Sequence, residues 1–372
     1  MAAHGLGGAD VDLVLVFVSP QHVGEARAVA EVVHDRLSPR ALAGACGESV
    51  IGRGRELEGV PGVSVLAASL PGTRVRASHV VARRDPAGSV MLTLPAEFAP
   101  PPPAEGAVVL LCDPYTFPVD GFLTLLQREW GGALAVGGLA SGGGAPGEHV
   151  LLCGREAKRE GAVVLELGGG VELRTLVSQG CAPIGPELVV TAAEGNAVLE
   201  LAGRPAYERL VEVLVSLDPE RQRLAARGVL AGLVIDENRA EYGRDDYLIR
   251  GVLGADASAG AVYVGDQPRV GQTMRFHIRD AASADDDLRQ ALRGERTLPV
   301  RPVAGVLFAC NGRGRRMFPE ADHDAAAVEQ ELGGIPTAGM FCAGEVGPVG
   351  GTNFVHGFTA TMAILVEDSS EA

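Results

Sequence analysis

The sequence is poor in aromatic residues and in positive charge, and these shortages exclude whole classes of protein. Only 4% of its 372 residues are aromatic, and 32 Lys and Arg stand against 47 Asp and Glu, for a net charge of -15. A general nucleic-acid binder normally carries a basic stripe that neutralises phosphates, so we expect no nucleic-acid partner. No apolar run reaches the roughly 18 residues of a membrane helix, and the N-terminus lacks the pattern of a signal peptide. We therefore expect a cytoplasmic protein without a membrane partner.

Closely spaced cysteines and histidines are also missing. The six cysteines form no CxxC pair, and the eight histidines show no HxH or HxxxH spacing. These patterns would be typical of zinc sites or of a disulfide framework. Their absence predicts no metal site and favours a reducing compartment.

Glycine and apolar residues are abundant, at 51 residues and 47% of the chain, and they follow an order that occurs three times. Each time a buried strand is followed by an amphipathic helix, a second apolar run and a glycine-rich loop. The first strands are predicted at 13–18, 107–112 and 303–310, and the loops at 44–48, 137–144 and 343–348. A βαβ crossover brings both strand carboxyl ends to one edge of a sheet, where ligands bind in open α/β sheets. We expect the three loops to share a ligand-facing edge.

Between these units the pattern is antiparallel. Hairpins are predicted at 162–177 and 188–201, helices at 205–217 and 219–227, a meander of strands from 230 to 279, and a short exposed helix at 285–292. The fold class is therefore α/β of the mixed α+β kind, with repeated β-α-β crossover units and antiparallel hairpins in two layered domains. We place these domains at 1–202 and 203–372.

Charged residues gather at the third glycine-rich loop. Asn311, Arg313 and Gly314 follow the strand and offer forked and backbone donors that suit a carboxylate or phosphate. If the three copies share their geometry, Glu345, next to Gly344, lies on the neighbouring loop, where Glu345 and Arg313 would hold the ammonium and carboxylate of an amino acid. Two alternatives stay open: the arginines pair with the acidic surface, or Glu345 pairs with Arg313 and only ties the loops together.

Two cysteines and one histidine offer other chemistry. Cys310 and Cys342 each end a predicted strand, and a nucleophilic role would need a base such as His356. His356, three residues after Asn353 among apolar neighbours, could instead be the axial ligand of a haem. The plainer alternatives are small core cysteines and a histidine held by a backbone hydrogen bond.

Several segments, taken together, resemble the FIST family of bacterial sensory and eukaryotic F-box-associated proteins. The segments are QGCAPIG at 179–185, FACNGRG at 308–314, GEVGP at 344–348 and His356-Gly357 with Thr359, together with GACGE at 44–48 and GGLA at 137–140. The resemblance covers nearly the whole chain, in the order of the family's N-terminal and C-terminal domains.

The resemblance implies a sensory module that binds a small molecule such as an amino acid. It also implies that some members are haem-dependent nitric oxide sensors partnered with histidine kinases. We predict a signal-transduction protein, without enzymatic activity, that holds an amino acid or small anion between its glycine-rich loops and acts through a separate partner. The alternatives are a haem-based nitric oxide sensor with a histidine kinase partner and a cysteine-dependent hydrolase. The predicted ligand-binding residues are Gly47, Glu48, Asn311, Arg313, Gly314, Cys342, Gly344, Glu345, Asn353 and His356.

Overall fold

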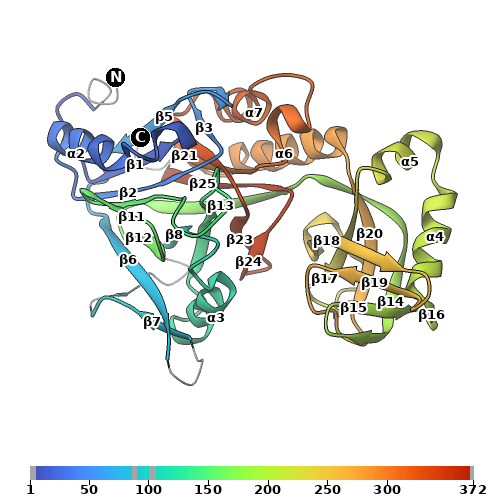
Figure 1. Cartoon of the computed structure of the whole chain (residues 1–372). Helices are drawn as coiled ribbons and strands as arrows, with labels where there is room; N and C mark the ends of the chain where they lie inside the picture. Colours follow the sequence, from blue (N-terminus) through green and yellow to red (C-terminus); the bar gives the residue numbers. More distant parts are fainter. Residues whose placement is uncertain (1–5, 86–89, 97, 100–105, 369–372) are drawn as a thin grey trace. The chain divides into compact units, whose positions relative to one another are not determined.

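The computed structural model describes residues 6–85, 90–96, 98–99 and 106–368. The chain forms two compact units (Figure 1). Unit 1 consists of Met1–Ser178, Leu288–Val355 and Thr359–Ala372, and unit 2 of Gln179–Asp287 with His356–Phe358. The mixed α+β class is confirmed. The compact units divide the chain differently from the predicted family domains 1–202 and 203–372, whose boundary stays a prediction.

Unit 1 contains the three predicted crossovers, and in each of them the two strands pair in parallel. Their elements are β1 (Leu13–Val18), α2 (Ala26–Leu37) and β2 (Ala41–Cys46); β8 (Gly106–Cys112), α3 (Val119–Glu129) and β9 (Leu134–Leu139); and β21 (Val300–Cys310), α7 (His323–Leu332) and β22 (Thr337–Cys342). The local periodicity of strand and helix is enough to specify these units, because each apolar face repeats within a few residues.

Each crossover is followed by two short strands and a closing strand, which we call a copy. The following strands are β3 (Ser49–Gly52), β4 (Arg55–Glu58) and β5 (Val63–Ala68) in the first copy; β10 (Leu151–Cys153), β11 (Glu156–Lys158) and β12 (Ala162–Gly168) in the second; and β23 (Glu345–Val349), β24 (Thr352–His356) and β25 (Thr359–Asp368) in the third. In every copy the closing strand runs antiparallel to the copy's own first strand.

The short strands tie the three copies into a closed cycle. β3 of the first copy pairs with β22 of the third, β23 of the third pairs with β9 of the second, and β10 of the second pairs with β2 of the first. Each copy thus lends a strand to the sheet of another copy. Because this exchange follows directly after each glycine-rich loop, the cycle brings the loops of different copies into contact.

One central core lies between the sheets of the three copies. It collects inward-facing residues from all copies, such as Val16, Val109 and Phe308. Alternate residues of the same strands face outward, where Leu110 packs beneath α3 and Leu307 beneath α7. This alternation is the expected consequence of strand geometry, since successive side chains point to opposite faces.

Three further strands complete the sheets of unit 1, and they correct one prediction. These strands are β6 (Arg74–Arg84), β7 (Val90–Thr93) and β13 (Glu172–Gln179). Residues 162–177 do not form a hairpin, because β12 lies between β6 and β8 whereas β13 is the neighbour of β25 in a different sheet. The glycine turn between β12 and β13 carries the chain from one sheet to another. In these sheets β12 pairs with β6 and β8, and β13 lies beside β25.

Unit 2 is an antiparallel sheet with two helices against one face (Figure 1). Its strands are β14 (Cys181–Glu194), β15 (Ala197–Leu201), β16 (Arg204–Pro205), β17 (Val229–Val234), β18 (Tyr247–Asp256), β19 (Ala261–Val264) and β20 (Thr273–Arg279), and its helices are α4 (Ala206–Ser216) and α5 (Pro219–Ala225). The predicted hairpin at 188–201 is confirmed, with β14 and β15 paired antiparallel.

The helix predicted at 285–292 is longer and less exposed than expected. It is α6 (Ala281–Arg296), and its Leu288 and Leu292 are fully buried in an apolar cluster of unit 1. The many acidic residues of its first half led to the prediction of an exposed helix, although these leucines are four residues apart and form one face. Three 3₁₀ turns complete the described elements, η1 (Pro20–His22), η2 (Arg244–Asp246) and η3 (Gly314–Arg316). Nowhere in the described ranges is a helix both long and apolar enough to cross a membrane.

Candidate functional site

The three glycine-rich loops meet at the side chain of Ser141. Its hydroxyl accepts the N–H of Glu48 from the first copy at 2.8 Å and donates to the carbonyl of Phe341 in the third copy at 2.7 Å. The same hydroxyl lies 3.2 Å from the amide oxygen of Asn311. The structure therefore brings Glu48 and Asn311 to one edge. The sequence analysis missed Ser141. The one feature that could have indicated it is a lone hydroxyl side chain within a glycine-rich segment.

Arg313 is the largest fully buried side chain among the described residues, with 0% of it exposed. Its guanidinium forms a two-pronged ion pair with Asp324 of α7, with Nε–Oδ2 and Nη2–Oδ1 distances of 2.6 and 2.8 Å. The Phe318 ring lies 5.3 Å from the guanidinium carbon. Burial alone would raise the pKa of Asp324, but the guanidinium outweighs burial and holds that pKa far below its usual range. Arg313 thus pairs with a specific buried carboxylate and not with the acidic surface.

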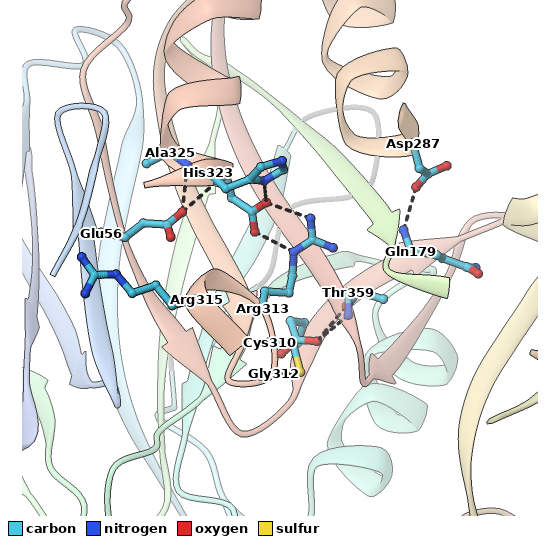
Figure 2. A network of polar contacts seen from close by, with 12 residues as sticks. Glu56, Gln179, Asp287, Cys310, Gly312, Arg313, Arg315, His323, Ala325 and Thr359 are labelled. Carbon is cyan, nitrogen blue, oxygen red and sulfur yellow. Dashed lines mark hydrogen bonds and ion pairs between the residues drawn. The ribbon is translucent and has the colours of Figure 1, made fainter. Parts of the chain in front are cut away.

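Glu345, the first residue of β23, is also fully buried. Its Oε2 accepts the hydroxyl of Thr359 at 2.8 Å and the backbone N–H of Thr359 at 3.3 Å (Figure 2). Burial raises the pKa of Glu345 to about 8, although the Thr359 hydrogen bonds and the Arg313 charge act against this rise. The two charges influence each other, yet each makes its hydrogen bonds to a different residue. A direct pair between Glu345 and Arg313 is therefore not what ties the loops together.

Arg313 and Glu345 share one unusual feature. Within the part of the chain that the structure describes, Nη1 of Arg313 and Oε1 of Glu345 are buried without any hydrogen-bond partner. Buried polar atoms are normally paired, because an unpaired one costs about 1–3 kcal/mol. Two side chains of opposite charge in the third copy therefore carry an unsatisfied atom, a donor on Arg313 and an acceptor on Glu345, in addition to the hydroxyl of Thr361, which is also unpaired among the described residues.

A second buried carboxylate, Glu56 of β4, bonds to the helix turn that carries Asp324, the partner of Arg313. The sequence analysis also missed this residue. Its Oε1 accepts the N–H groups of Asp324 and Ala325 at 2.9 and 3.0 Å, which satisfies the first turn of α7 (Figure 2). His323 bonds to Asp324 at 2.9 Å. Burial, and then the Asp324 charge, raise the pKa of Glu56 to about 8. No local signal in the sequence links residues this far apart.

The remaining residues of the predicted loops lie close to this cluster. Glu48 forms an ion pair with the exposed Arg316, which also donates to the carbonyl of Asn311 at 2.9 Å. Gly47 must be glycine, since a Cβ there would lie 2.6 Å from the Cβ of Met340. Gly314 is buried and begins η3. These contacts make the outer rim of the edge polar and partly exposed.

Other predicted residues have structural partners. The Cys342 thiol is buried, donates to the Met340 carbonyl at 3.6 Å, and has its pKa raised by burial, which disfavours it as the first group to attack a substrate. The carbonyl of Gly344 accepts the N–H of Leu139 at 2.8 Å. The amide of Asn353 bridges backbone groups of Ala133 and Ala135, both at 2.8 Å. Asn353 therefore fixes the start of β9.

His356 is buried and belongs to unit 2, whereas Arg313 and Glu345 belong to unit 1. The structure therefore does not place these three residues in one compact unit. A haem bound through His356 and a cysteine hydrolase stay predictions. Among the described residues, no group of three or more His, Cys, Asp or Glu could hold a metal ion.

In the second copy, the residue that follows the first crossover strand, as Asn311 does in the third, is paired within its own copy. Asp113, which follows β8, accepts from His149 Nδ1 at 2.8 Å and from the Thr116 hydroxyl at 2.6 Å. His149 Nε2 in turn accepts the N–H of Gly143 at 3.2 Å. This pair is buried like the one in the third copy, but its hydrogen bonds are complete.

The first copy has no charge at this position. Ser19 follows β1, and its hydroxyl accepts the N–H of Gly62 at 2.9 Å. In the third copy Asn311 holds this position, and the buried Arg313 and Glu345 lie two residues after it and at the start of β23. A surface pocket of about 230 Å³ elsewhere in unit 1, lined by Tyr115, Phe117 and their neighbours, contains none of the predicted residues.

Fold and edge together define an α+β protein with three interlocked crossover copies and an incompletely bonded pair of buried charges. The chain belongs to the FIST family: the FIST N domain matches residues 12–204 and the FIST C domain residues 206–348. FIST domains are sensory domains of signal transduction. The chain is similar to the uncharacterized Mycobacterium tuberculosis protein Rv0628c, 41% identical over 370 residues, which are 98% of this chain and 95% of that protein. It is also similar to the uncharacterized Mycobacterium bovis protein Mb0898c, 40% identical over 367 residues, which are 98% and 92% of the two chains.

Proposed function

We propose that this protein is a sensory component of signal transduction that binds an amino acid at the edge formed by its glycine-rich loops, next to Arg313 and Glu345. The observation that carries the proposal is the pair of unsatisfied atoms, Nη1 of Arg313 and Oε1 of Glu345, on two fully buried side chains. A ligand with one acceptor and one donor would complete both hydrogen-bond sets.

An amino acid suits this pair better than a simple anion. Asp324 already neutralises Arg313, so a lone anion would meet a pair whose net charge is zero. The carboxylate of an amino acid can accept from Nη1, and its ammonium group can donate to Oε1 of Glu345. Charge-assisted hydrogen bonds of this kind are stronger than neutral ones. The ammonium group also favours the ionised form of Glu345.

The comparison among the three copies supports the choice of place. After its first strand the second copy holds a buried Asp113–His149 pair that its own residues satisfy, and the first copy has the uncharged Ser19 there. The third copy differs in carrying an unsatisfied donor and an unsatisfied acceptor on two buried side chains of opposite charge, which suits an external ligand with one acceptor and one donor.

In this proposal the ligand reaches Arg313 and Glu345 from the polar, partly exposed rim of the loop edge. Glu48, Asn311 and Arg316 are partly or largely exposed, and they lie on the loops that flank Arg313. Loops positioned by a rigid scaffold are common places for ligand binding and can move without disturbing the sheets. In this proposal the ligand displaces the rim contact between Glu48 and Arg316.

The proposal includes a cytoplasmic location and a separate output partner such as a histidine kinase. A sensory domain needs such a partner to turn ligand occupancy into a signal. Once calorimetry has identified an amino acid that binds, affinity capture with and without that amino acid would identify a partner whose binding changes with the ligand.

Calorimetry of the full chain against the common amino acids and small anions tests the binding step. We expect one class of amino acid to bind, and we expect Glu345→Gln to weaken it at least about tenfold, because a charge-assisted hydrogen bond contributes about 1.5–3 kcal/mol. The matched control is Glu367→Gln, which removes an exposed partner of Arg301. Equal affinity in wild type and Glu345→Gln would place the ligand elsewhere, and no binding by any amino acid would refute the ligand class.

A further inference from the structure

Two cysteines face each other across the parallel strands that lead to the proposed site. Cys310 and Cys342 are the last residues of β21 and β22 and are register partners. Neighbouring strands lie about 4.7–4.9 Å apart, which falls inside the Cα separation of about 4.4–6.8 Å seen in disulfides. Paired residues of parallel strands also point to the same face of the sheet. The backbone therefore allows a disulfide between them, although the structure holds neither cysteine in one.

The other two copies show that this pairing is particular to the third. At the same register position the first copy pairs Val18 with Cys46, and the second pairs Cys112 with Leu139. A lone cysteine at either position is an ordinary small core residue. The third copy has two thiols in register, and it is also the copy with the unsatisfied Arg313 and Glu345.

The two thiols lie in different surroundings. Cys310 is half-buried, the N–H of Gly312 donates to its Sγ at 3.4 Å, and its Sγ lies near enough to the Arg313 guanidinium to interact with it electrostatically. A backbone donor and a cation both favour the thiolate, which is the form that reacts. Cys342 is fully buried and donates its proton to a backbone carbonyl. Cys310 can therefore meet an oxidant first, and Cys342 can close the bridge afterwards.

We propose that Cys310 and Cys342 form a reversible oxidation site that responds to peroxides. The Cys310 thiolate attacks one peroxide oxygen, the O–O bond breaks, and the Sγ becomes a sulfenic acid while hydroxide leaves and takes up a proton as water. The Cys342 sulfur then attacks Sγ of Cys310, its proton goes to the leaving hydroxyl, and the disulfide and a second water form. Two thiols and one hydrogen peroxide give one disulfide and two waters.

The bridge would act on the loop that carries Arg313. Forming the S–S bond draws Sγ of Cys310 away from the N–H of Gly312, which begins the turn leading into Arg313 and η3. Oxidation would therefore change the position of the guanidinium. This effect on ligand binding rests on the proposed function, whereas the oxidation itself does not.

Peroxide titration of the full chain, followed by alkylation and peptide mass spectrometry, tests the site. We expect loss of two thiols per molecule, a peptide cross-linked between Cys310 and Cys342, and full recovery with dithiothreitol. Cys112→Ser, at the equivalent lone position, should leave this result unchanged, and so should Cys153→Ser, which removes a half-buried cysteine outside the pair. In Cys342→Ala we expect a Cys310 sulfenic acid that dimedone traps.

Two outcomes would overturn the proposal. One is a folded protein in which Cys153 is oxidised while both Cys310 and Cys342 remain alkylatable. The other is oxidation of Cys310 without a bridge in wild type, giving sulfinic acid directly. Neither readout involves an amino acid, so a correct cross-link together with absent ligand binding would refute only the proposed function.

Discussion

The carboxylate of Glu345 holds Thr359 through both the hydroxyl and the backbone N–H with one oxygen, while its other oxygen has no partner among the described residues. Thr359 is the residue at which the chain re-enters unit 1 after His356–Phe358. The preceding Phe358 has a φ of 67°, which non-glycine residues rarely adopt. Glu345 therefore fixes a strained point of the chain with one oxygen and offers the other to the proposed ligand.

Ligand binding should release a proton near neutral pH. Burial raises the pKa of Glu345 to about 8, so the carboxyl group is mostly protonated at pH 7 before binding. An ammonium group at Oε1 would favour the carboxylate, and we expect release of about one proton per ligand. The measurement is the binding enthalpy in buffers with different ionisation enthalpies. In Glu345→Gln residual binding should show no buffer dependence; a wild-type enthalpy that is the same in every buffer would contradict the protonation change.

Stability should fall as the pH rises from about 5 to 8. Glu56 and Glu345 both have pKa values raised to about 8, whereas an unfolded glutamate titrates near about 4.3. Between these values the folded state binds more protons, so the free energy of unfolding decreases with pH, by up to about 1.4 kcal/mol per pH unit for each group. Stability from this source is complete below the unfolded pKa and is lost as the pH passes the folded pKa.

Urea denaturation at a series of pH values measures this slope. Glu345→Gln and Glu56→Gln should each flatten it, because a glutamine does not titrate. Glu367→Gln, on an exposed carboxylate, serves as the control and should leave the slope as in wild type. Identical slopes in all four proteins would mean that neither buried carboxyl titrates in this range.

The crossover copies could be predicted from the sequence because their signals are local. In β1 six consecutive apolar residues are all buried, and α3 presents Phe122, Leu123 and Leu126 on one face. The exchange between copies could not be predicted in this way. β3 and β10 contain only 4 and 3 residues, and their partners β22 and β2 lie far away in the sequence. Short strands of this kind carry too few side chains to specify a partner.

The candidate site, too, could be predicted only where its signals are local in the sequence. Arg313 and Glu345 follow strand ends, so a rule about sheet edges singles them out as candidates. Their partners Asp324, Glu56 and Thr359 come from other elements, and only the folded chain joins them. Asn353 and His356 follow the third glycine-rich loop closely in the sequence, yet Asn353 fixes the start of β9 and His356 belongs to unit 2. Proximity in sequence was a poor guide to contact in this segment.

Removal of the partner of Arg313 should be costly. Asp324→Asn leaves a fully buried guanidinium without its counter-charge, and such a loss costs about 3–5 kcal/mol. Chemical denaturation at pH 7 measures the change in the free energy of unfolding. The control Glu367→Gln breaks the ion pair between Glu367 and Arg301, whose side chains are 59% and 68% exposed, respectively. Loss of this exposed pair should cost at most about 1 kcal/mol. Similar small losses in both variants would show that the buried pair is not required for folding.

The close approach of paired strands in each copy should make Gly339 intolerant of a methyl group. A Cβ at Gly339 would lie 1.9 Å from the carbonyl oxygen of Leu307, which is the register partner of Gly339 on β21, so the backbone of β21 or β22 must shift. Backbone shifts of this kind cost about 1–3 kcal/mol or more, and we expect Gly339→Ala to lower the free energy of unfolding by at least that amount. Gly294→Ala is the matched change, because Gly294 lies in α6 with nothing within 4 Å of its Cβ position. Alanine favours a helix over glycine by about 0.8–1.0 kcal/mol, so this variant should be more stable than wild type. If both variants lost stability equally, steric contact between β21 and β22 would not be the cause.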